Sequence, residues 1–227
     1  MVSSAMKAPE EFTTKLPWLA LNMACVTWPA LRTQLAQYVA APGAVQRLQE
    51  EGIPLLEAVL PGLTEKLEVV QQGRAFAREM DHLQATDIRV TTLGEANYPE
   101  ALRWIPEPPP VLYIWGTLRH EDSLAVAVVG SRKPSPYGQI AAQRLSAELA
   151  QYGFTVVSGL ARGVDSLAHQ GALRAGGRTI AVLGSGINVV YPPEHRRLYE
   201  AIRAQGAVAG QASGRSTDTA RRAHTSP

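Results

Sequence analysis

The chain has 227 residues, of which 45% are hydrophobic and 19% charged, and its formal net charge is +2. This length suits one large domain or two small ones, and the composition is that of a globular protein. A single cysteine, Cys25, excludes an internal disulfide and fits a reducing compartment. We find no signal-peptide pattern and no apolar run as long as a membrane span, so we expect a cytoplasmic protein without a membrane partner.

Residues 1–15 are polar and are expected to be disordered. Helical patterns then follow one another closely, which predicts a small all-α domain over residues 16–86. We expect its helices at residues 16–26, 29–40, 42–51, 54–60 and 64–84. Two short strands are predicted next, at residues 88–93 and 111–115, and the second is expected at a sheet edge.

Two tryptophans in this connecting region have two possible roles. Trp104 and Trp115 could offer flat faces on which nucleic-acid bases stack. The alternative is that they anchor the core or an interface, which is the commoner role of tryptophan. The sequence leaves both roles open.

The second half of the chain repeats one pattern three times. Apolar runs at residues 125–129, 154–157 and 179–183 are each followed by a loop rich in Gly and Ser and then by a helical pattern. Such repetition predicts a parallel sheet with crossover helices, and it predicts that the first strand is buried on both faces. We expect the helix near residue 137 to pack through Ala141, Leu145 and Leu149. The three loops follow the carboxyl ends of their strands, so they are expected to converge on one site.

These loops have the residues of an anion-binding site. Small residues at helix N-termini leave backbone N–H groups free for phosphate, and arginine adds a planar fork that pairs with it. The candidate residues are Gly130, Ser131, Arg132 and Lys133 in the first loop, Ser158, Gly159, Arg162 and Gly163 in the second, Gly184 in the third, and Arg178 as a helper. The alternative is that the glycines only make tight turns.

The distribution of charge supports a polyanion. Residues 1–124 hold 10 Lys and Arg against 15 Asp and Glu, whereas residues 130–180 hold six against two. The basic segment coincides with the glycine-rich loops, which favours a polyanionic partner there. Arg144 and Arg174 are expected only to face solvent on their helices.

Several chemistries are not indicated. The dinucleotide fingerprint is incomplete because Val189 stands where its third glycine belongs, and no P-loop pattern occurs. Asp165 is best interpreted as a residue of a helix's first turn. His169, four residues later, could act as a general acid or base, although packing within its own helix is the simpler interpretation. We therefore assign no catalytic residue, metal or cofactor.

The motifs resemble the DNA-processing protein A family (DprA, also called Smf). The similarity spans residues 88–206, and its motifs are Asn97-Tyr98-Pro99, PPPVLY from Pro108, VVGSR ending at Arg132, SGLARGVD from Ser158, and TIAVLG from Thr179 with Tyr191-Pro192. The resemblance implies a Rossmann-like domain whose basic pocket binds single-stranded DNA. It also implies protection of that DNA, loading of the RecA recombinase during natural transformation, and a homodimer.

Two other functions remain open at this point. Related Rossmann-like folds hydrolyse nucleotides, with Arg162 and Asp165 as the pair that could serve here. The chain could instead be a remnant without function, because the family pattern is lost near Val208. We expect a truncation or frameshift there, an incomplete Rossmann-like domain over residues 87–206, and a disordered tail over residues 207–227 in which only Ala207 and Val208 begin a strand.

Overall fold

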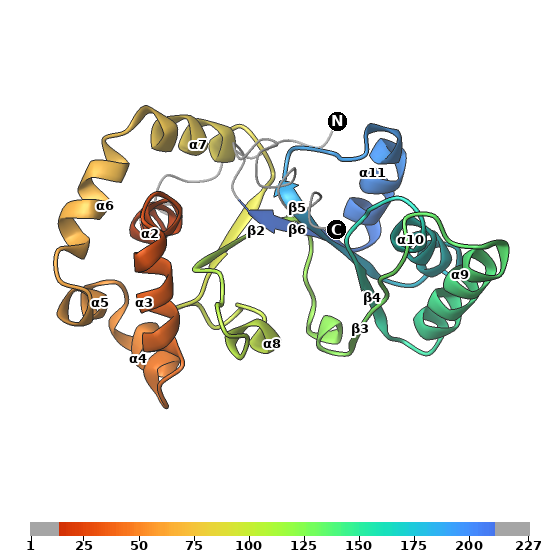
Figure 1. Cartoon of the computed structure of the whole chain (residues 1–227), viewed down its shortest axis with the longest axis horizontal. Helices are drawn as coiled ribbons and strands as arrows, with labels where there is room; N and C mark the ends of the chain where they lie inside the picture. The colour runs from red at the N-terminus through yellow and green to blue at the C-terminus, as the bar shows by residue number, and fades with distance from the viewer. Residues whose placement is uncertain (1–13, 212–227) are drawn as a thin grey trace. The chain divides into compact units, whose positions relative to one another are not determined.

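The computed structural model describes residues 14–211, and its compact parts are unit 1, which ends at Leu112, and unit 2, which begins at Tyr113 (Figure 1). Residues 1–13 and 212–227, most of the predicted disordered ends, lie outside the described residues. The division falls later than residue 86 because β1 (Arg89–Thr92) is tied to the helices before it. Lys15 Nζ donates to Val90 O at 2.7 Å and pairs with Glu95 at 3.2 Å.

Unit 1 is mainly helical, as predicted. Its helices are α2 (Leu16–Thr27), α3 (Pro29–Val39), α4 (Ala44–Glu51), α5 (Pro54–Val59), α6 (Leu63–Gln71), α7 (Arg74–Gln84) and the short α8 (Glu100–Arg103). Proline stands in the first turn of α2, α3 and α5, where its missing N–H is tolerated. Leucines fill the core, among them Leu19, Leu21, Leu48, Leu56 and Leu83.

One predicted helix is two helices. The pattern over residues 64–84 is interrupted between α6 and α7, where Gly73 is extended with φ −77° and ψ 143°. Glycine is a poor interior helix residue, costing about 1 kcal/mol relative to alanine, so it is a favourable place for the break. The break allows Leu67 of α6 and Phe76 of α7 each to be buried.

Six strands form one sheet in the order β1-β2-β6-β5-β4-β3. The further strands are β2 (Val111–Gly116), β3 (Ala125–Ala127), β4 (Thr155–Ser158), β5 (Thr179–Gly186) and β6 (Ala207–Gln211). Strands β3 to β6 run parallel, whereas β2 pairs antiparallel with β6. The Rossmann-like α/β class is confirmed. The expectation that β2 lies at an edge is wrong, because β2 has a neighbour on both sides.

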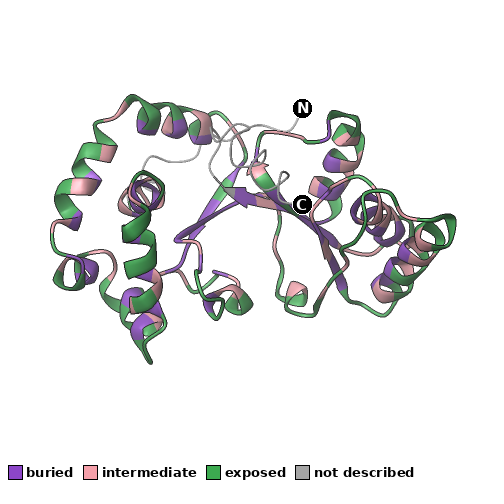
Figure 2. Cartoon of the chain, in the orientation of Figure 1, coloured by how far each residue is buried: buried purple, intermediate pink, exposed green. Residues whose placement is uncertain are grey.

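The crossover helices of unit 2 are α9 (Pro136–Gln151), α10 (Val164–Arg174) and α11 (Arg196–Gln205), and a single turn, η2 (Pro193–His195), precedes α11. Figure 2 shows that α9 is buried along one side only. The buried face is Ala142, Ser146 and Ala150, shifted by one residue from the predicted stripe, so Leu145 is exposed. Small residues form the buried face because α10 lies close against α9. A Cβ at Gly171 of α10 would overlap the backbone of Gln143 in α9.

Two further predictions about the sheet are wrong. The strand expected over residues 125–129 ends at Ala127. It is not buried on both faces, because Ala125 and Ala127 are exposed and Val126 is only partly buried. Residues 207–211, assigned to a disordered tail, form β6 between β2 and β5, as the strand pattern at Ala207 and Val208 indicated. Among the described helices, none has the length and apolarity needed to cross a bilayer.

Candidate functional site

The loops after β3 and β4 are locked together by close backbone contacts. Val164 N donates to Ser131 O at 3.1 Å. Gly163 has φ +82°, and a Cβ there would overlap Ser131 O and come within 2.8 Å of Arg132, so only glycine fits. Gly130 similarly faces the Val164 side chain, which a Cβ would approach to 2.9 Å. The two loops therefore present one continuous surface, as their position at the same sheet edge predicted.

The second loop is held in shape from within the fold. Ser158 Oγ donates at 2.6 Å to a backbone carbonyl at the end of the neighbouring strand. Gly159 N donates to Asp165 Oδ2 at 3.2 Å, and Asp165 is buried, which fits its interpretation as a residue of the helix's first turn. Leu160 is buried with φ 59°, and its carbonyl lies 2.9 Å from His195 Nδ1. The loop is thus a preorganised element rather than a mobile one.

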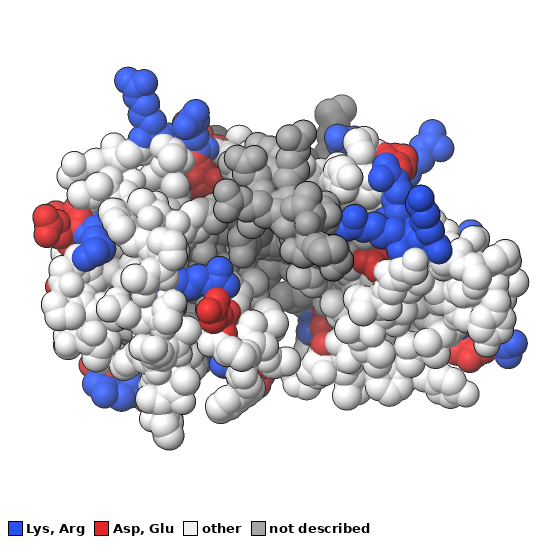
Figure 3. Space-filling model, viewed as in Figure 1, with Lys and Arg blue, Asp and Glu red and all other residues white. Residues whose placement is uncertain are grey.

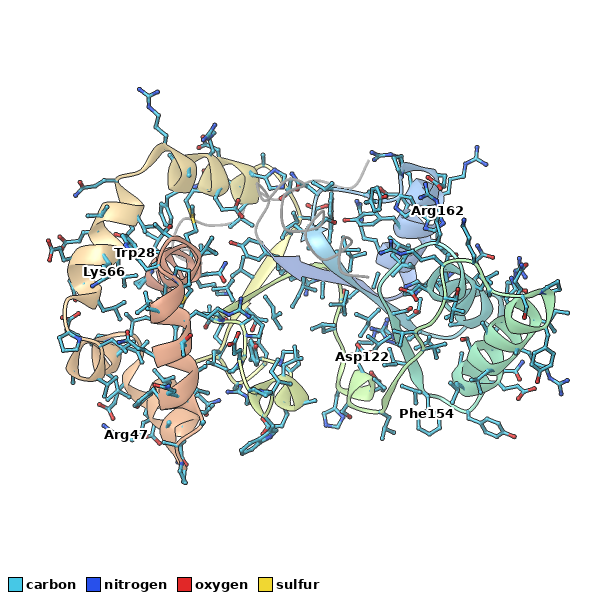
Figure 4. The ribbon with its side chains drawn as sticks, viewed as in Figure 1. Trp28, Arg47, Lys66, Asp122, Phe154 and Arg162 are labelled. Carbon is cyan, nitrogen blue, oxygen red and sulfur yellow. The ribbon has the colours of Figure 1, made fainter. Side chains whose placement is uncertain are left out.

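Basic side chains border the joined loops. Ser131 Oγ accepts from Lys133 N at 3.0 Å, which folds the first loop so that Arg132 and Lys133 stand at its exposed tip. Arg162 lies beside α11, as Figure 4 shows, and pairs with Glu194 at 2.6 Å with both side chains about half exposed. Hydrogen bonding from Arg162 holds the pKa of Glu194 below its usual value, so the pair is ionised at neutral pH.

Two arginines were missed by the sequence reasoning. Arg196 and Arg197 are exposed at the start of α11, directly after the loop that carries Glu194. Their signal was available, because the first turn of the helix that follows a loop of a parallel sheet lies at the same edge as the loop. In the face drawn in Figure 3, Lys and Arg side chains gather around α11.

Gly184 differs from Gly130 and Gly163 in that no neighbouring atom excludes a side chain there. It lies near the carboxyl end of β5, and a Cβ there would meet nothing within 4 Å. The strand also continues to Gly186, beyond the predicted end at residue 183. The structure therefore brings Gly184 to the predicted edge, but space does not require glycine there.

Arg178 does not belong to this site. It precedes Thr179, the first residue of β5, and so lies at the amino end of the parallel strands. Its guanidinium donates to both carboxylate oxygens of Asp122 at 2.8 Å, to Gln205 O at 3.0 Å and to Thr117 O at 2.7 Å. Burial alone would raise the pKa of Asp122, but hydrogen bonds from Arg178, the Arg119 backbone and Thr155 hold that pKa below its usual value. Arg178 is a structural residue.

His169 is also structural. It is fully buried, and its Nδ1 lies 2.6 Å from Thr179 Oγ1. Because that hydroxyl donates its own proton to Val156 O at 2.7 Å, it accepts from His169 Nδ1–H. Burial, reinforced by the nearby charge of His195, lowers the pKa of His169 to about 4. The imidazole is therefore neutral at physiological pH. His169 is a packed residue, as expected, but it bonds to Thr179 of β5 and not to its own helix.

The two tryptophans differ in their surroundings. Trp115 packs edge-on against Tyr199 with ring centroids 6.1 Å apart, and the Arg203 guanidinium lies 4.4 Å from its ring centre. This arrangement is that of an anchor. Trp104 is 79% exposed.

The edge as a whole is suited to holding an extended anion. It combines the N-termini of α9, α10 and α11 with five cations, Arg132, Lys133, Arg162, Arg196 and Arg197, against the two carboxylates Asp165 and Glu194. Helix N-termini and arginine forks both favour phosphate oxygens. Contacts of this kind address a nucleic-acid backbone and not its bases.

Comparison with known proteins gives a consistent result. A sequence model of the family described as "DNA recombination-mediator protein A" matches residues 89–224, past the point near Val208 at which we expected a break. The protein Smf of Synechocystis is 37% identical over 203 residues, which is 84% of this chain and 49% of that protein. The DNA processing protein DprA of Bacillus subtilis is 31% identical over 134 residues, 59% of this chain and 45% of that protein.

A solved structure is similar as well. The X-ray structure of DNA processing protein A from Streptococcus pneumoniae aligns with a TM-score of 0.63 and 27% identity, covering 86% of this chain and 68% of that chain. The present chain spans about half the length of the two curated relatives named above.

Proposed function

The chain belongs to the DNA recombination-mediator protein A family, and on that basis we propose that unit 2 binds single-stranded DNA at the loops after β3 and β4. The observation that carries the proposal is the interlocking of the two loops around Gly163, which sets Arg132, Lys133 and Arg162 along one preorganised edge. The proposed phosphate cradle comprises Gly130, Ser131, Arg132, Lys133, Ser158, Gly159, Arg162 and Gly163, with Gly184, Arg196 and Arg197 at its border. Arg178 is not included.

The wider role that we propose is handling of DNA in natural transformation. A protein that covers the phosphates of a single strand without reading bases protects that strand irrespective of its sequence. Loading of RecA, action in the cytoplasm and formation of a homodimer are further parts of the proposal. Their support is the family membership and the DNA-processing name of the Bacillus relative. No catalytic step is included.

The test is fluorescence anisotropy of a labelled oligo-dT and a duplex of equal length over a salt series. We expect preference for the single strand and affinity that falls steeply with salt. Arg132→Ala is expected to weaken binding equally for all sequences and to reduce the salt slope by about one phosphate contact. Arg144→Ala is the matched control, because Arg144 is an exposed cation on α9 paired with Glu148 at 2.7 Å. Equal effects of the two substitutions would refute the cradle.

RecA loading is tested separately. The rate of RecA filament assembly on oligo-dT is measured with and without the chain, and again with the Arg132→Ala variant. Faster assembly that depends on Arg132 is the expected result. An unchanged rate from a chain that binds the DNA would remove RecA loading and leave the binding proposal standing.

A further inference from the structure

Unit 1 contains a cavity of about 740 Å³ that the DNA site does not use. One wall is the end of α3 and the turn into α4, and the other wall is α8 and the proline-rich segment after it. We call it the Trp104 groove. The lining residues that matter here are Val39, Pro42, Gln46, Gln49, Trp104 and Ile105. Its size is within the range of about 300–1,000 Å³ that is typical of small-ligand sites.

The aromatic wall of the groove is exposed and fixed. Trp104 is 79% exposed, and Ile105 beside it is 39% exposed. Trp104 Nε1 donates to Glu100 Oε1 at 3.1 Å, which satisfies the polar atom of the indole and restrains the ring. An exposed indole at the mouth of an apolar cavity offers its face to a flat ligand.

Two amide side chains give the groove a polar edge. When the Gln49 amide is oriented with its oxygen toward Arg103, Oε1 accepts from that guanidinium at 2.9 and 3.1 Å, and the NH₂ group is left as a donor. Gln46 Nε2 donates to Glu50 Oε1 at 3.2 Å, which leaves the Gln46 carbonyl as an acceptor. The Gln49 donor and the Gln46 acceptor come from neighbouring turns of one helix. Together they match the edge of a heterocyclic base, which carries both donors and acceptors.

The charges of the groove do not favour a phosphate. Arg103 donates to the backbone carbonyls of Leu93 and Glu95 at 2.9 and 2.6 Å and pairs with Glu100 at 3.1 Å. Glu107 pairs with Arg32 at 2.9 Å. Each arginine near the groove thus already faces a carboxylate, so the groove suits a neutral planar group rather than an anion.

We propose that the Trp104 groove binds a nucleobase, stacked on the indole of Trp104 with its edge toward Gln46 and Gln49. The proposal rests on the proposed single-stranded DNA binding, and it adds a base contact to the phosphate contacts of the cradle. It gives unit 1, whose net charge does not favour phosphate, a role toward the same ligand. The rival occupant is an apolar, proline-rich peptide of a protein partner.

The first test compares two labelled oligonucleotides with equal numbers of phosphates, an oligo-dT and an abasic strand. The wild-type chain is expected to prefer oligo-dT, and Trp104→Leu, which keeps apolar bulk but removes the indole, is expected to reduce that preference by about five-fold or more. Binding of the abasic strand should not change. Tyr152→Ala is the control, because Tyr152 is an equally exposed aromatic (83%) in unit 2.

The outcomes separate this proposal from the cradle. Arg132→Ala is expected to weaken both strands by the same factor. A preference that Trp104→Leu leaves intact, or equal weakening of both strands by Trp104→Leu, would overturn the base site while the cradle stands. Failure of the wild-type chain to bind either strand would refute the cradle, and the second test then decides the base site alone.

The second test titrates free adenosine, which has no phosphate, and follows tryptophan emission. Quenching in the wild-type chain that is lost in Trp104→Leu is the expected result, because the three other tryptophans remain in that variant. No quenching by adenosine would overturn the proposal. Quenching by a proline-rich peptide but not by adenosine would overturn it too and would assign the groove to a protein partner.

Discussion

The two ends of the parallel strands in unit 2 use the same residue type in opposite ways. At the amino end, Arg178 is 16% exposed and donates hydrogen bonds to Asp122 and to two backbone carbonyls. At the carboxyl end, Arg162 is 54% exposed, and Glu194 is the carboxylate that pairs with it among the described residues. An arginine enclosed by acceptors holds a fold together, whereas an arginine half in water keeps donors for a ligand.

This contrast extends beyond the arginines. The amino end is a partly buried polar network in which Asp122 also accepts from Thr155 Oγ1 at 2.7 Å, and Thr179 joins His169 to the backbone of β4. The carboxyl end is a set of exposed cations on tightly built loops. We therefore expect substitutions at the amino end to change stability without changing DNA affinity, and substitutions at the carboxyl end to do the reverse.

The largest effect is expected from Arg178→Ala. Removing the guanidinium leaves the Asp122 carboxylate, 7% exposed, without its main partner, and stranding one member of such a pair costs about 3 kcal/mol or more. Urea unfolding measures the loss, and the salt slope of oligo-dT binding is expected to stay unchanged. Arg162→Ala is the matched control and is expected to leave the free energy of unfolding within about 0.5 kcal/mol. A reduced salt slope for Arg178→Ala would return Arg178 to the DNA site.

The next effect is a pH dependence set by His169. Its pKa falls from 6.5 in the unfolded chain to about 4 in the fold, so folding favours the neutral imidazole. The resulting stability is fully present above the unfolded pKa and is lost as pH falls toward the folded pKa. Linkage gives a loss of about 2 kcal/mol between pH 7 and pH 5.

The measurement is urea unfolding at both pH values for the wild-type chain and for His169→Asn. The asparagine Nδ2 can replace the imidazole Nδ1 as donor to Thr179, and it does not titrate. The variant is expected to lose that part of the pH dependence whatever its stability at pH 7. An equal pH dependence in the two chains would show that folding does not lower the pKa of His169.

Much of this fold could be predicted from the sequence because the signals are local. Helices α2 to α5 follow from apolar spacing, and prolines mark the starts of α2, α3 and α5. The three strand-loop-helix units follow from their repetition. The convergence of the loops that carry Ser131 and Gly163 followed from topology alone, since parallel strands place their loops at one edge.

What could not be predicted depends on neighbours that are distant in sequence. The exposure of β3 and the interior position of β2 are properties of strand order, which no local pattern encodes. Arg178 was assigned to the site because it lies in a basic stretch, yet its partner Asp122 lies 56 residues away in the chain. Arg196 and Arg197 differ from Arg178, because their place in the helix after the third loop is readable from the sequence and indicates the same sheet edge.

Gly163→Ala tests whether the loops at the carboxyl end are preorganised. Gly163 and Gly153 both have positive φ, +82° and +87°, but only Gly163 has neighbours that a Cβ would meet. Gly153→Ala therefore measures backbone strain alone, about 1 kcal/mol, and Gly163→Ala is expected to cost about 1 kcal/mol more. Urea unfolding measures both costs.

Only Gly163→Ala is expected to weaken oligo-dT binding as well, because it displaces Ser131 and Arg132. Equal behaviour of the two variants would show that the loops are not held by this contact.

The smallest expected effect separates the two arginines most directly. Glu194→Gln removes the carboxylate that pairs with Arg162, so an exposed cation at the sheet edge gains freedom to meet a phosphate. We expect oligo-dT affinity to rise by about two- to three-fold at low salt and the gain to shrink as salt increases. Stability is not expected to change measurably, because exposed ion pairs contribute little. The gain must disappear when Glu194→Gln is combined with Arg162→Ala, since the cation that it releases is then absent. If the gain persisted in the double variant, it would come from the general loss of negative charge beside Arg196 and Arg197, and release of Arg162 would not be its cause.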